Sequence, residues 1–449
     1  MSIRERLYPG EQQLPVLARH CSDARYVWNL ALEQRNSWRC ERSLKITYNT
    51  QAHELAEVRK SSWLKEGSSV VQQQALRDLN QAFQNWWKRP DHFGRPTWRK
   101  AGINEGFAVR DLFVRRINRK WGQVFLPKCG WVKFRVTREW NDIETASSAR
   151  VTLDRSGRWF VSFTRLAPQI EHKSTGAIVG IDMGVTHTVA TSNGDFLDMP
   201  ELRTKGERQR KRRLQRKLAR QVQGSNRRKA TKLAIAKLAA KEVDRRKDWI
   251  EKTTTELVRK YDMIALEDLK IKNMTKSAKG TKDKPGKNVA QKSGLNRVIL
   301  EQGWGLFRQR LTDKAINAMT PVEIIAIHPA YTSLRCSECG YTDKKNRESQ
   351  ALFHCLSCDY TDNAGVHAAK NIIAAGLAVT ERGGQPNAAP IKAKHSDPAK
   401  RTPILKLHEQ LGKLGPSGPR RCHPDDPSEV GNDRYIIGAD EFRSTYIEA

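Results

Sequence analysis

The sequence predicts a mixed α/β protein of several domains, and three observations support this fold class. Apolar residues recur at helical spacing before residue 90, and short β-branched and aromatic runs follow between about 107 and 167. Apolar strands then alternate with helical segments up to about residue 378. The length of 449 residues suits about two to four domains.

The first predicted element is a helical unit. Between Cys21 and Arg35, apolar residues recur every three or four positions, and the same spacing returns between Ser68 and Lys88. Proline disfavours a helical residue before it, so KRPDHFGRP should end the second helix. The Trp and Phe residues of this unit are most simply core residues, with base stacking as the alternative for any one of them.

The next region should form a small antiparallel sheet or barrel. Its strands are WGQVFLP, WVKFRV, ARVTLD and RWFVSFTR, with a turn at Asp154-Arg155-Ser156-Gly157. Two further strands lie in AIVGIDMGVTHTVATSNGDFL, where Asn193-Gly194 is a hairpin signal.

The later elements alternate between helix and strand. Residues 203–247 predict two very basic helices broken at Gly224-Ser225-Asn226, and DMIALEDL predicts a buried strand. MTKSAKGTKDKPGKNVAQKSGLN should be a loop, RVILEQGWGLFRQRLTDKA one helix, and VEIIAIHPAY a strand. From about residue 380 we expect a mostly disordered tail in which only RYIIGADEF offers local order.

The charge of the chain points to a polyanionic partner. There are 81 Lys and Arg residues against 49 Asp and Glu, a net charge of +32. Within 203–247 the basic residues outnumber the acids several-fold, so ion pairs inside the helices cannot account for them, and nucleic-acid contact is the favoured interpretation. No apolar run reaches about 18 residues and no secretory signal is recognisable, so we expect a cytoplasmic, nucleoid-associated protein without a membrane partner.

Four of the eight cysteines form a metal-binding motif. Cys336 and Cys339 are followed after fifteen residues by Cys355 and Cys358, the spacing of a zinc ribbon. Each pair directs two thiolates at one point, so the four predict a closed, structural Zn²⁺ site. Iron is the main rival, disulfides are less favoured, and the neighbouring His354 would be a superfluous fifth ligand.

Two acids at strand positions form a second candidate site. Asp182 lies in the apolar run IVGIDMGV, and Glu267 ends MIALEDL. An unpaired ionised carboxylate would be costly in such surroundings. Two such acids suit a pair of Mg²⁺ or Mn²⁺ ions that activates water next to a phosphate, although hydrogen bonds or ion pairs could also satisfy them.

The order of the motifs resembles the TnpB (OrfB) family of transposon-encoded proteins, which are related to type V CRISPR effectors. The resemblance rests on GIDMGV, ALEDL, NVAQKSGLNRVILEQGWGLF, HPAYTSLRCSECG, NRESQALFHCLSC and AAKNI, in this order between about residues 20 and 378. It implies an RNase H/RuvC-like α/β core with an inserted zinc ribbon, preceded by a small β-barrel that carries a helical unit.

The resemblance also implies domain limits. An N-terminal strand and helical recognition unit would span 1–105, and a wedge-like barrel 106–170. The nuclease core would span 171–330, with the basic insertion at 203–247. The ribbon would span 331–361, the last RuvC helix 362–378, and the tail 379–449.

The implied activity is RNA-guided cleavage of DNA. A guide RNA from the transposon end would pair with double-stranded target DNA, and Asp182 and Glu267 would hold the catalytic Mg²⁺ or Mn²⁺. Within the basic insertion, the candidate nucleic-acid ligands are Arg208, Arg212, Arg213, Arg216 and Arg220.

The third acid of the family pattern is missing. The pattern asparagine, alanine, aspartate, any residue, asparagine reads Asn363, Ala364, Gly365, Val366, His367 here. Glycine offers no metal ligand. If the last helix begins at Asp362, that residue shares a face with position 365 and could replace the lost aspartate. His367 could ligate a metal, but a surface position on the helix is the simpler expectation.

The resemblance together with this departure implies a transposon-associated, RNA-guided DNA-binding protein whose RuvC-like endonuclease site is impaired at Gly365. Alternatively, the protein could be a fully active RNA-guided endonuclease that uses Asp362 as its third acid, or an RNA-guided repressor that occupies its target without cutting. A transposase that acts on its own element's ends draws only on the older name of the family.

Overall fold

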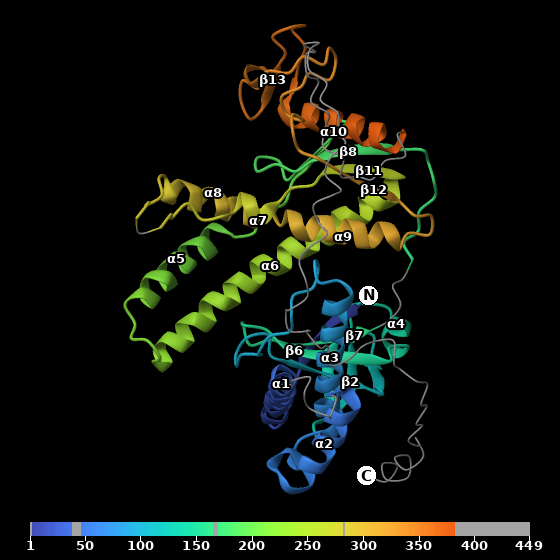
Figure 1. Cartoon of the computed structure of the whole chain (residues 1–449), viewed down its shortest axis with the longest axis vertical. Helices are drawn as coiled ribbons and strands as arrows, with labels where there is room; N and C mark the ends of the chain where they lie inside the picture. Colours follow the sequence, from blue (N-terminus) through green and yellow to red (C-terminus); the bar gives the residue numbers. More distant parts are fainter. Residues whose placement is uncertain (1, 38–45, 165–168, 282, 382–449) are drawn as a thin grey trace, which may run out of the picture. The chain divides into compact units, whose positions relative to one another are not determined.

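The computed structural model describes residues 2–37, 46–164, 169–281 and 283–381 (Figure 1). They form two compact units. The first comprises residues 2–37, 46–154 and 158–164, and the second 155–157, 169–281 and 283–381. The predicted tail, including RYIIGADEF, lies almost entirely outside the described residues. The six-part division into domains stays a prediction.

The first unit is built on a seven-stranded antiparallel sheet in the order β2-β6-β7-β1-β5-β4-β3. Its strands are β1 (Ser2–Tyr8), β2 (Gly106–Arg110), β3 (Val114–Asn118), β4 (Trp121–Leu126), β5 (Gly130–Arg135), β6 (Ser148–Leu153) and β7 (Trp159–Thr164). The predicted strands are thus present. β2 and β3 are the two edge strands, and they do not pair with each other in the described residues. The sheet is therefore open, and the predicted barrel is not confirmed.

Helices complete the core of the first unit. They are α1 (Gln13–Asn36), α2 (Tyr48–Ser61), η1 (Trp63–Glu66), α3 (Ser69–Lys88) and α4 (Trp140–Glu144). α1 and α3 pack against each other and against β2. The side chains at helical spacing are buried there together with alternate residues of the strands, because each element can remove only one face from water.

The second unit has a five-stranded sheet in the order β10-β9-β8-β11-β12. β8 (Ile178–Asp182), β11 (Met263–Glu267) and β12 (Glu323–Ile327) are parallel, and β9 (Val189–Thr191) and β10 (Phe196–Leu197) continue the sheet antiparallel. The turn at Asn193-Gly194 joins β9 to β10 as predicted.

Helices cover both faces of this sheet (Figure 1). α6 (Asn226–Lys260) and α9 (Trp304–Ile316) bury one face, which includes Ile181 and Leu266. α10 (Ala364–Glu381) covers the other. α10 approaches β8 so closely that a Cβ on Gly180 would lie 2.1 Å from the Ala369 carbonyl oxygen, so only glycine fits there.

Two helical predictions need correction. Instead of one helix over 297–315, α8 (Val289–Gln302) and α9 meet at Gly303, whose φ of +73° is left-handed and ends the first helix. The predicted loop 274–296 is also shorter, since α7 (Ile271–Met274) precedes it and α8 begins inside it.

The basic insertion forms two helices, as predicted. α5 (Lys205–Ala219) and α6 are separated by a turn containing Gly224. Thr204 caps α5 in a reciprocal pair with Glu207, and Ser225 caps α6. No helix within the described ranges is long and apolar enough to cross a bilayer.

Candidate functional site

Asp182 and Glu267 lie side by side at the carboxyl ends of two neighbouring strands. β8 and β11 are parallel, and their register pairs Ile181 with Leu266, the residues just before the two acids. Alternate side chains of a strand point to opposite faces. Ile181 and Leu266 belong to the core under α6 and α9, so both acids face the α10 side of the sheet.

Burial gives both carboxyl groups unusual acidities. Desolvation raises the pKa of Asp182 to about 6, and desolvation together with the negative charge of Asp182 raises that of Glu267 to about 7. A nearby like charge disfavours ionisation, so the proximity of Asp182 adds to the effect of burial on Glu267. Such paired, perturbed acids are typical of functional sites.

Two residues that the sequence did not single out complete the surroundings. The Thr332 hydroxyl donates to Glu267 Oε1 at 2.6 Å, which orients that carboxylate. The positive charge of Arg347, in the cysteine-containing segment, lowers the pKa of both acids against the effect of burial. Both residues lie inside motifs that carry the resemblance, Thr332 in HPAYTSLRCSECG and Arg347 in NRESQALFHCLSC, but nothing local to either motif relates them to the two acids.

Gly365 faces Asp182 from the first turn of α10. A Cβ at this position would lie 3.7 Å from Asp182 Oδ2 and 3.1 Å from the Cβ of Ala190, on β9. The Asn363 side chain caps the helix here, because its Oδ1 accepts hydrogen bonds from the Gly365 and Val366 amides. The position matched to the family's third acid therefore adjoins Asp182, but it carries no side chain.

Asp362 is engaged elsewhere. The helix begins at Ala364, and Asp362 belongs to the short strand β14 (Thr361–Asn363), so the condition for its sharing a helical face with position 365 is not met. Its Oδ2 pairs with Lys370 Nζ and accepts from the Tyr360 hydroxyl, both at 2.8 Å.

His367 is buried instead of lying on the surface. Its ring stacks on Phe353 with the centroids 3.5 Å apart, and its Nε2 accepts a hydrogen bond from the Ser337 amide at 3.2 Å. Desolvation lowers the pKa of this histidine to about 4, so the ring is neutral. It packs α10 against the segment that carries the cysteines, which corrects the expectation of an exposed histidine.

The acidic site fits a divalent cation only in part. Asp182 and Glu267 offer the hard oxygen ligands that Mg²⁺ and Mn²⁺ prefer. Among the described residues, however, they do not belong to any group of three His, Cys, Asp or Glu side chains close enough together to hold one ion. Two carboxylates would leave most of the coordination shell of each ion to water.

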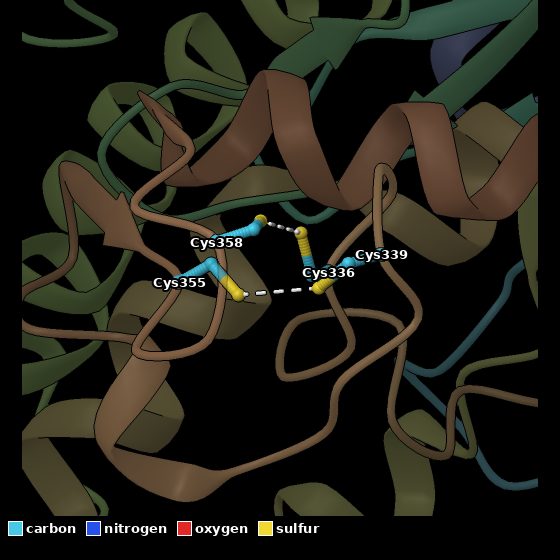
Figure 2. A group of neighbouring side chains, drawn as sticks. All are labelled: Cys336, Cys339, Cys355 and Cys358. Atoms are coloured by element: carbon cyan, nitrogen blue, oxygen red, sulfur yellow. Dashed lines mark hydrogen bonds between the residues drawn. The ribbon is translucent and has the colours of Figure 1, made fainter.

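The four grouped cysteines fit a zinc ion well (Figure 2). Their sulfur atoms all lie within 4.8 Å of one another, with Cys336 Sγ 3.7 Å from Cys358 Sγ and Cys339 Sγ 3.5 Å from Cys355 Sγ. Tetrahedral Zn–S bonds of about 2.3 Å would place sulfurs about 3.8 Å apart. All four are free thiols, and His354 turns away to Glu348 and Asp359.

Short elements bring these four thiols together. The two cysteine pairs are joined by η2 (Lys344–Asn346) and β13 (Leu352–His354), and β13 pairs with β14. The buried Phe353 and Ala364 form a small core with Cys336 and Cys355. This core is too small to keep the segment folded by itself. A bound Zn²⁺ would therefore stabilise the fold and take no part in catalysis.

A basic groove lies where the α5–α6 hairpin turns. It has a volume of about 580 Å³ and is lined by Arg213, Arg216, Lys217, Arg220, Gln221 and Arg227. Among the five arginines predicted to bind nucleic acid, Arg208 instead pairs with Glu201 at 3.3 Å. Arg212 is exposed on α5 and does not line the groove.

The two raised carboxyl pKa values predict how stability depends on pH. A carboxyl whose pKa is higher in the folded than in the unfolded state takes up protons on folding, so the free energy of unfolding falls as pH rises from about 4 to about 7. Each group contributes at most about 1.4 kcal/mol per pH unit.

Urea unfolding at a series of pH values, without added Mg²⁺, measures this effect. The Asp182→Asn, Glu267→Gln double variant cannot ionise at the site and should therefore gain stability over the natural protein as pH rises through this window. Parallel curves for the two proteins would contradict the shared burial of the acids.

Comparisons with known proteins agree with these features. Residues 161–278 match a family model described as a probable transposase (OrfB, IS605 type), and 304–372 match the Cas12f1-like TNB domain. Residues 1–43 match a helix-turn-helix model, although residues 2–36 form one strand and one helix in the structure.

Two curated relatives align over most of their length. The putative RNA-guided DNA endonuclease InsQ of Escherichia coli (strain K12) is 36% identical over 84% of this chain and 92% of its own. A putative RNA-guided DNA endonuclease of Streptomyces pristinaespiralis is 31% identical over 85% and 90%. A solved Cas12f1–sgRNA–target DNA complex aligns with 83% of this chain and 98% of its own at 15% identity, but its TM-score is only 0.29.

Proposed function

The chain belongs to the TnpB (OrfB) family, and from this premise we propose that it is a transposon-associated, RNA-guided DNA-binding protein whose RuvC-like endonuclease site is impaired at Gly365. The observation that carries the proposal is the placement of Gly365, whose missing Cβ would lie 3.7 Å from Asp182 Oδ2. A third carboxylate at this point could share a cation with Asp182 and Glu267.

The loss should weaken catalysis more than it weakens binding. In a two-metal nuclease the bound cations supply an activated water and stabilise the leaving oxygen. Asp182 and Glu267 would hold and orient such ions, but with two carboxylates instead of three, cutting should be slow. DNA binding depends on phosphate contacts and on guide pairing, which do not involve Gly365.

The rival function, full cleavage with Asp362 as the third acid, has less support. Asp362 already forms an ion pair with Lys370, and freeing its carboxylate would break that pair and the hydrogen bond from Tyr360. A transposase acting alone draws on the family description only. Occupation of a target without cutting, as a repressor would do, is the limiting case of the proposal.

The proposed partners are a guide RNA from the transposon end and a double-stranded DNA target. Relatives of this chain are named as RNA-guided DNA endonucleases. The groove at the α5–α6 turn offers Arg213, Arg216 and Arg220 to a phosphate backbone, and phosphate contacts of this kind supply affinity without reading sequence. The guide would supply the sequence specificity.

Guide-dependent binding tests the proposal. The full chain, purified with its co-expressed RNA, should shift a DNA duplex complementary to the guide at a much lower protein concentration than a scrambled duplex. Product analysis with Mg²⁺ should find little cleavage. Binding of the scrambled duplex with equal affinity, or efficient cutting, would contradict the proposal.

A substitution in the groove provides the electrostatic control. Replacing Arg213, Arg216 and Arg220 with glutamine should weaken DNA binding. The slope of the logarithm of the binding constant against the logarithm of the salt concentration should become shallower by about one for each lost phosphate contact. Arg208, which is paired with Glu201, should have a smaller effect when replaced with glutamine.

A further inference from the structure

The first unit contains a cleft lined by exposed aromatic side chains. This aromatic cleft has a volume of about 450 Å³ and is lined by Tyr26 and Leu30 of α1, Trp63 of η1 and Trp98 of the segment after α3. Ser22, Arg25, Asn29 and Glu33 of α1 also border it. The volume lies in the range of small-ligand sites, about 300–1,000 Å³.

The aromatic rings of the cleft are unusually open to water. Tyr26 is 44% exposed, Trp63 49% and Trp98 51%, whereas tryptophan is ordinarily highly buried. Tyr26 and Trp63 meet edge to face, with their centroids 5.1 Å apart. Three such residues around one cavity form a larger apolar surface than scattered exposed residues do, and such surfaces mark interaction sites.

The backbone on both sides of Trp98 is fixed to α1. Trp28 Nε1 donates to the Thr97 carbonyl oxygen at 3.0 Å. The Asn29 amide binds both backbone groups of Arg99, accepting from its N–H at 2.8 Å and donating to its carbonyl oxygen at 3.0 Å. Trp98 is therefore held at the rim of the cleft although its ring is half exposed.

Trp63 is positioned in a similar way. The next residue, Leu64, is buried, and its carbonyl oxygen accepts hydrogen bonds from Arg59 and Gln72 at 2.7 and 3.0 Å. The Ser62 hydroxyl caps the same turn by accepting from the Leu64 amide. Two separate segments are thus anchored so that their tryptophans flank one opening, which reduces the entropy lost when a flat ligand enters.

The segment that carries Trp98 is basic, although Glu33 also lines the cleft and Arg99 lies 3.9 Å from Asp78. The segment from residue 88 to 100 that carries Trp98 contains five basic residues and one acid: Lys88, Arg89, Arg95, Arg99, Lys100 and Asp91. A flat apolar site beside this basic segment matches a nucleotide, whose base has aromatic faces and whose phosphate is negative. An uncharged apolar peptide would leave the positive charge without a counterpart.

We propose that the aromatic cleft binds an unpaired base of the guide RNA, an inference that rests on the proposed function. RNA is recognised largely through loops, bulges and ends whose bases unstack from the RNA and stack on aromatic side chains. The DNA target arrives as a duplex whose bases are already stacked. RNA is therefore the partner that can offer a free base before a target is bound.

Short probes test the cleft in the full chain freed of nucleic acid. Fluorescence anisotropy would compare a single-stranded RNA of mixed sequence, the same sequence as DNA, and a blunt RNA duplex. The Trp63→Ala, Trp98→Ala double variant should bind the single-stranded RNA about tenfold or more weakly, since each base stack is worth about 1–3 kcal/mol. Binding of the duplex should stay unchanged.

Two variants keep the test decisive. The Trp63→Phe, Trp98→Phe variant should keep most of the affinity for the single-stranded RNA, because a flat ring remains at both positions. Comparison with this variant also shows whether the alanine variant lost affinity because it failed to fold. Phe113→Ala is the matched control, since Phe113 is 65% exposed in the same unit but does not line the cleft.

Each adverse outcome identifies what failed. Unchanged RNA affinity in the alanine variant overturns the proposal, and an equal loss for the RNA duplex overturns base stacking as the function of the cleft. A change of oligomeric state on light scattering would show that the cleft binds a second copy instead. Guide-dependent binding of complementary DNA is measured separately, so failure of the cleft and failure of the proposed function can be told apart.

Discussion

Replacing Gly365 with aspartate is expected to raise Mg²⁺-dependent cleavage of guide-matched DNA by at least about 100-fold. The reason is that the rate of such a reaction changes by about this factor when a catalytic group is out of place. The new Cβ would lie 3.7 Å from Asp182 Oδ2, so its carboxylate would adjoin Asp182. The position also suits an acid electrostatically, since it lies in the first turn of α10.

Three further variants isolate the cause of such a gain. Gly365→Asn has nearly the same shape without the charge, and it should leave cleavage close to the natural level. Gly365→Ala measures the steric cost of a Cβ that would meet the Ala190 Cβ at 3.1 Å. Adding Asp182→Ala to the aspartate variant should abolish the gain.

The rate of plasmid linearisation, with bound DNA quantified in the same reactions, is the appropriate measurement. Restored cutting would show that a missing ligand is what limits the natural protein. If the aspartate variant is folded and binds DNA but does not cut, the impairment lies elsewhere and the role given to position 365 is wrong.

Removal of the cysteine cluster should have the second large effect. Elemental analysis should find one zinc per chain, and none after Cys336→Ser with Cys355→Ser. Structural zinc contributes about 10 kcal/mol or more to folding in small zinc peptides, so the segment that holds the cysteines should unfold when the ligands are lost.

That unfolding should reach the acidic site. Thr332 and Arg347, which influence Glu267 and Asp182, adjoin or belong to the cysteine segment, and His367 stacks on Phe353 within it. Limited proteolysis should therefore detect new cleavage between about residues 331 and 361, together with loosening of α10. Cys129→Ser, which removes a free cysteine from the other unit, is the control and should change neither zinc content nor proteolysis. Zinc retained by the double serine variant would refute the assignment of the ligands.

Periodicity and ligand spacing predicted much of the architecture, because these signals are local. The strands β4 to β7, the hairpin at Asn193-Gly194 and the break between α5 and α6 follow from residues close together in the chain. The predicted helix boundaries were wrong where a single residue ended a helix. Gly303 ends a helix inside an otherwise continuous apolar pattern by adopting a left-handed conformation.

The sequence by itself also singled out the four sulfur ligands and the two strand acids, since residue type and spacing identify these, while the resemblance to the family pointed to Gly365. Only the tertiary structure decided how they are related. Parallel pairing of β8 and β11 brings Asp182 beside Glu267 from 85 residues away along the chain, and packing of α10 on β8 turns Gly365 toward Asp182. The neutral, buried state of His367 and the ion pair of Asp362 likewise depend on neighbours from distant segments, because burial and partner charges are properties of the folded chain.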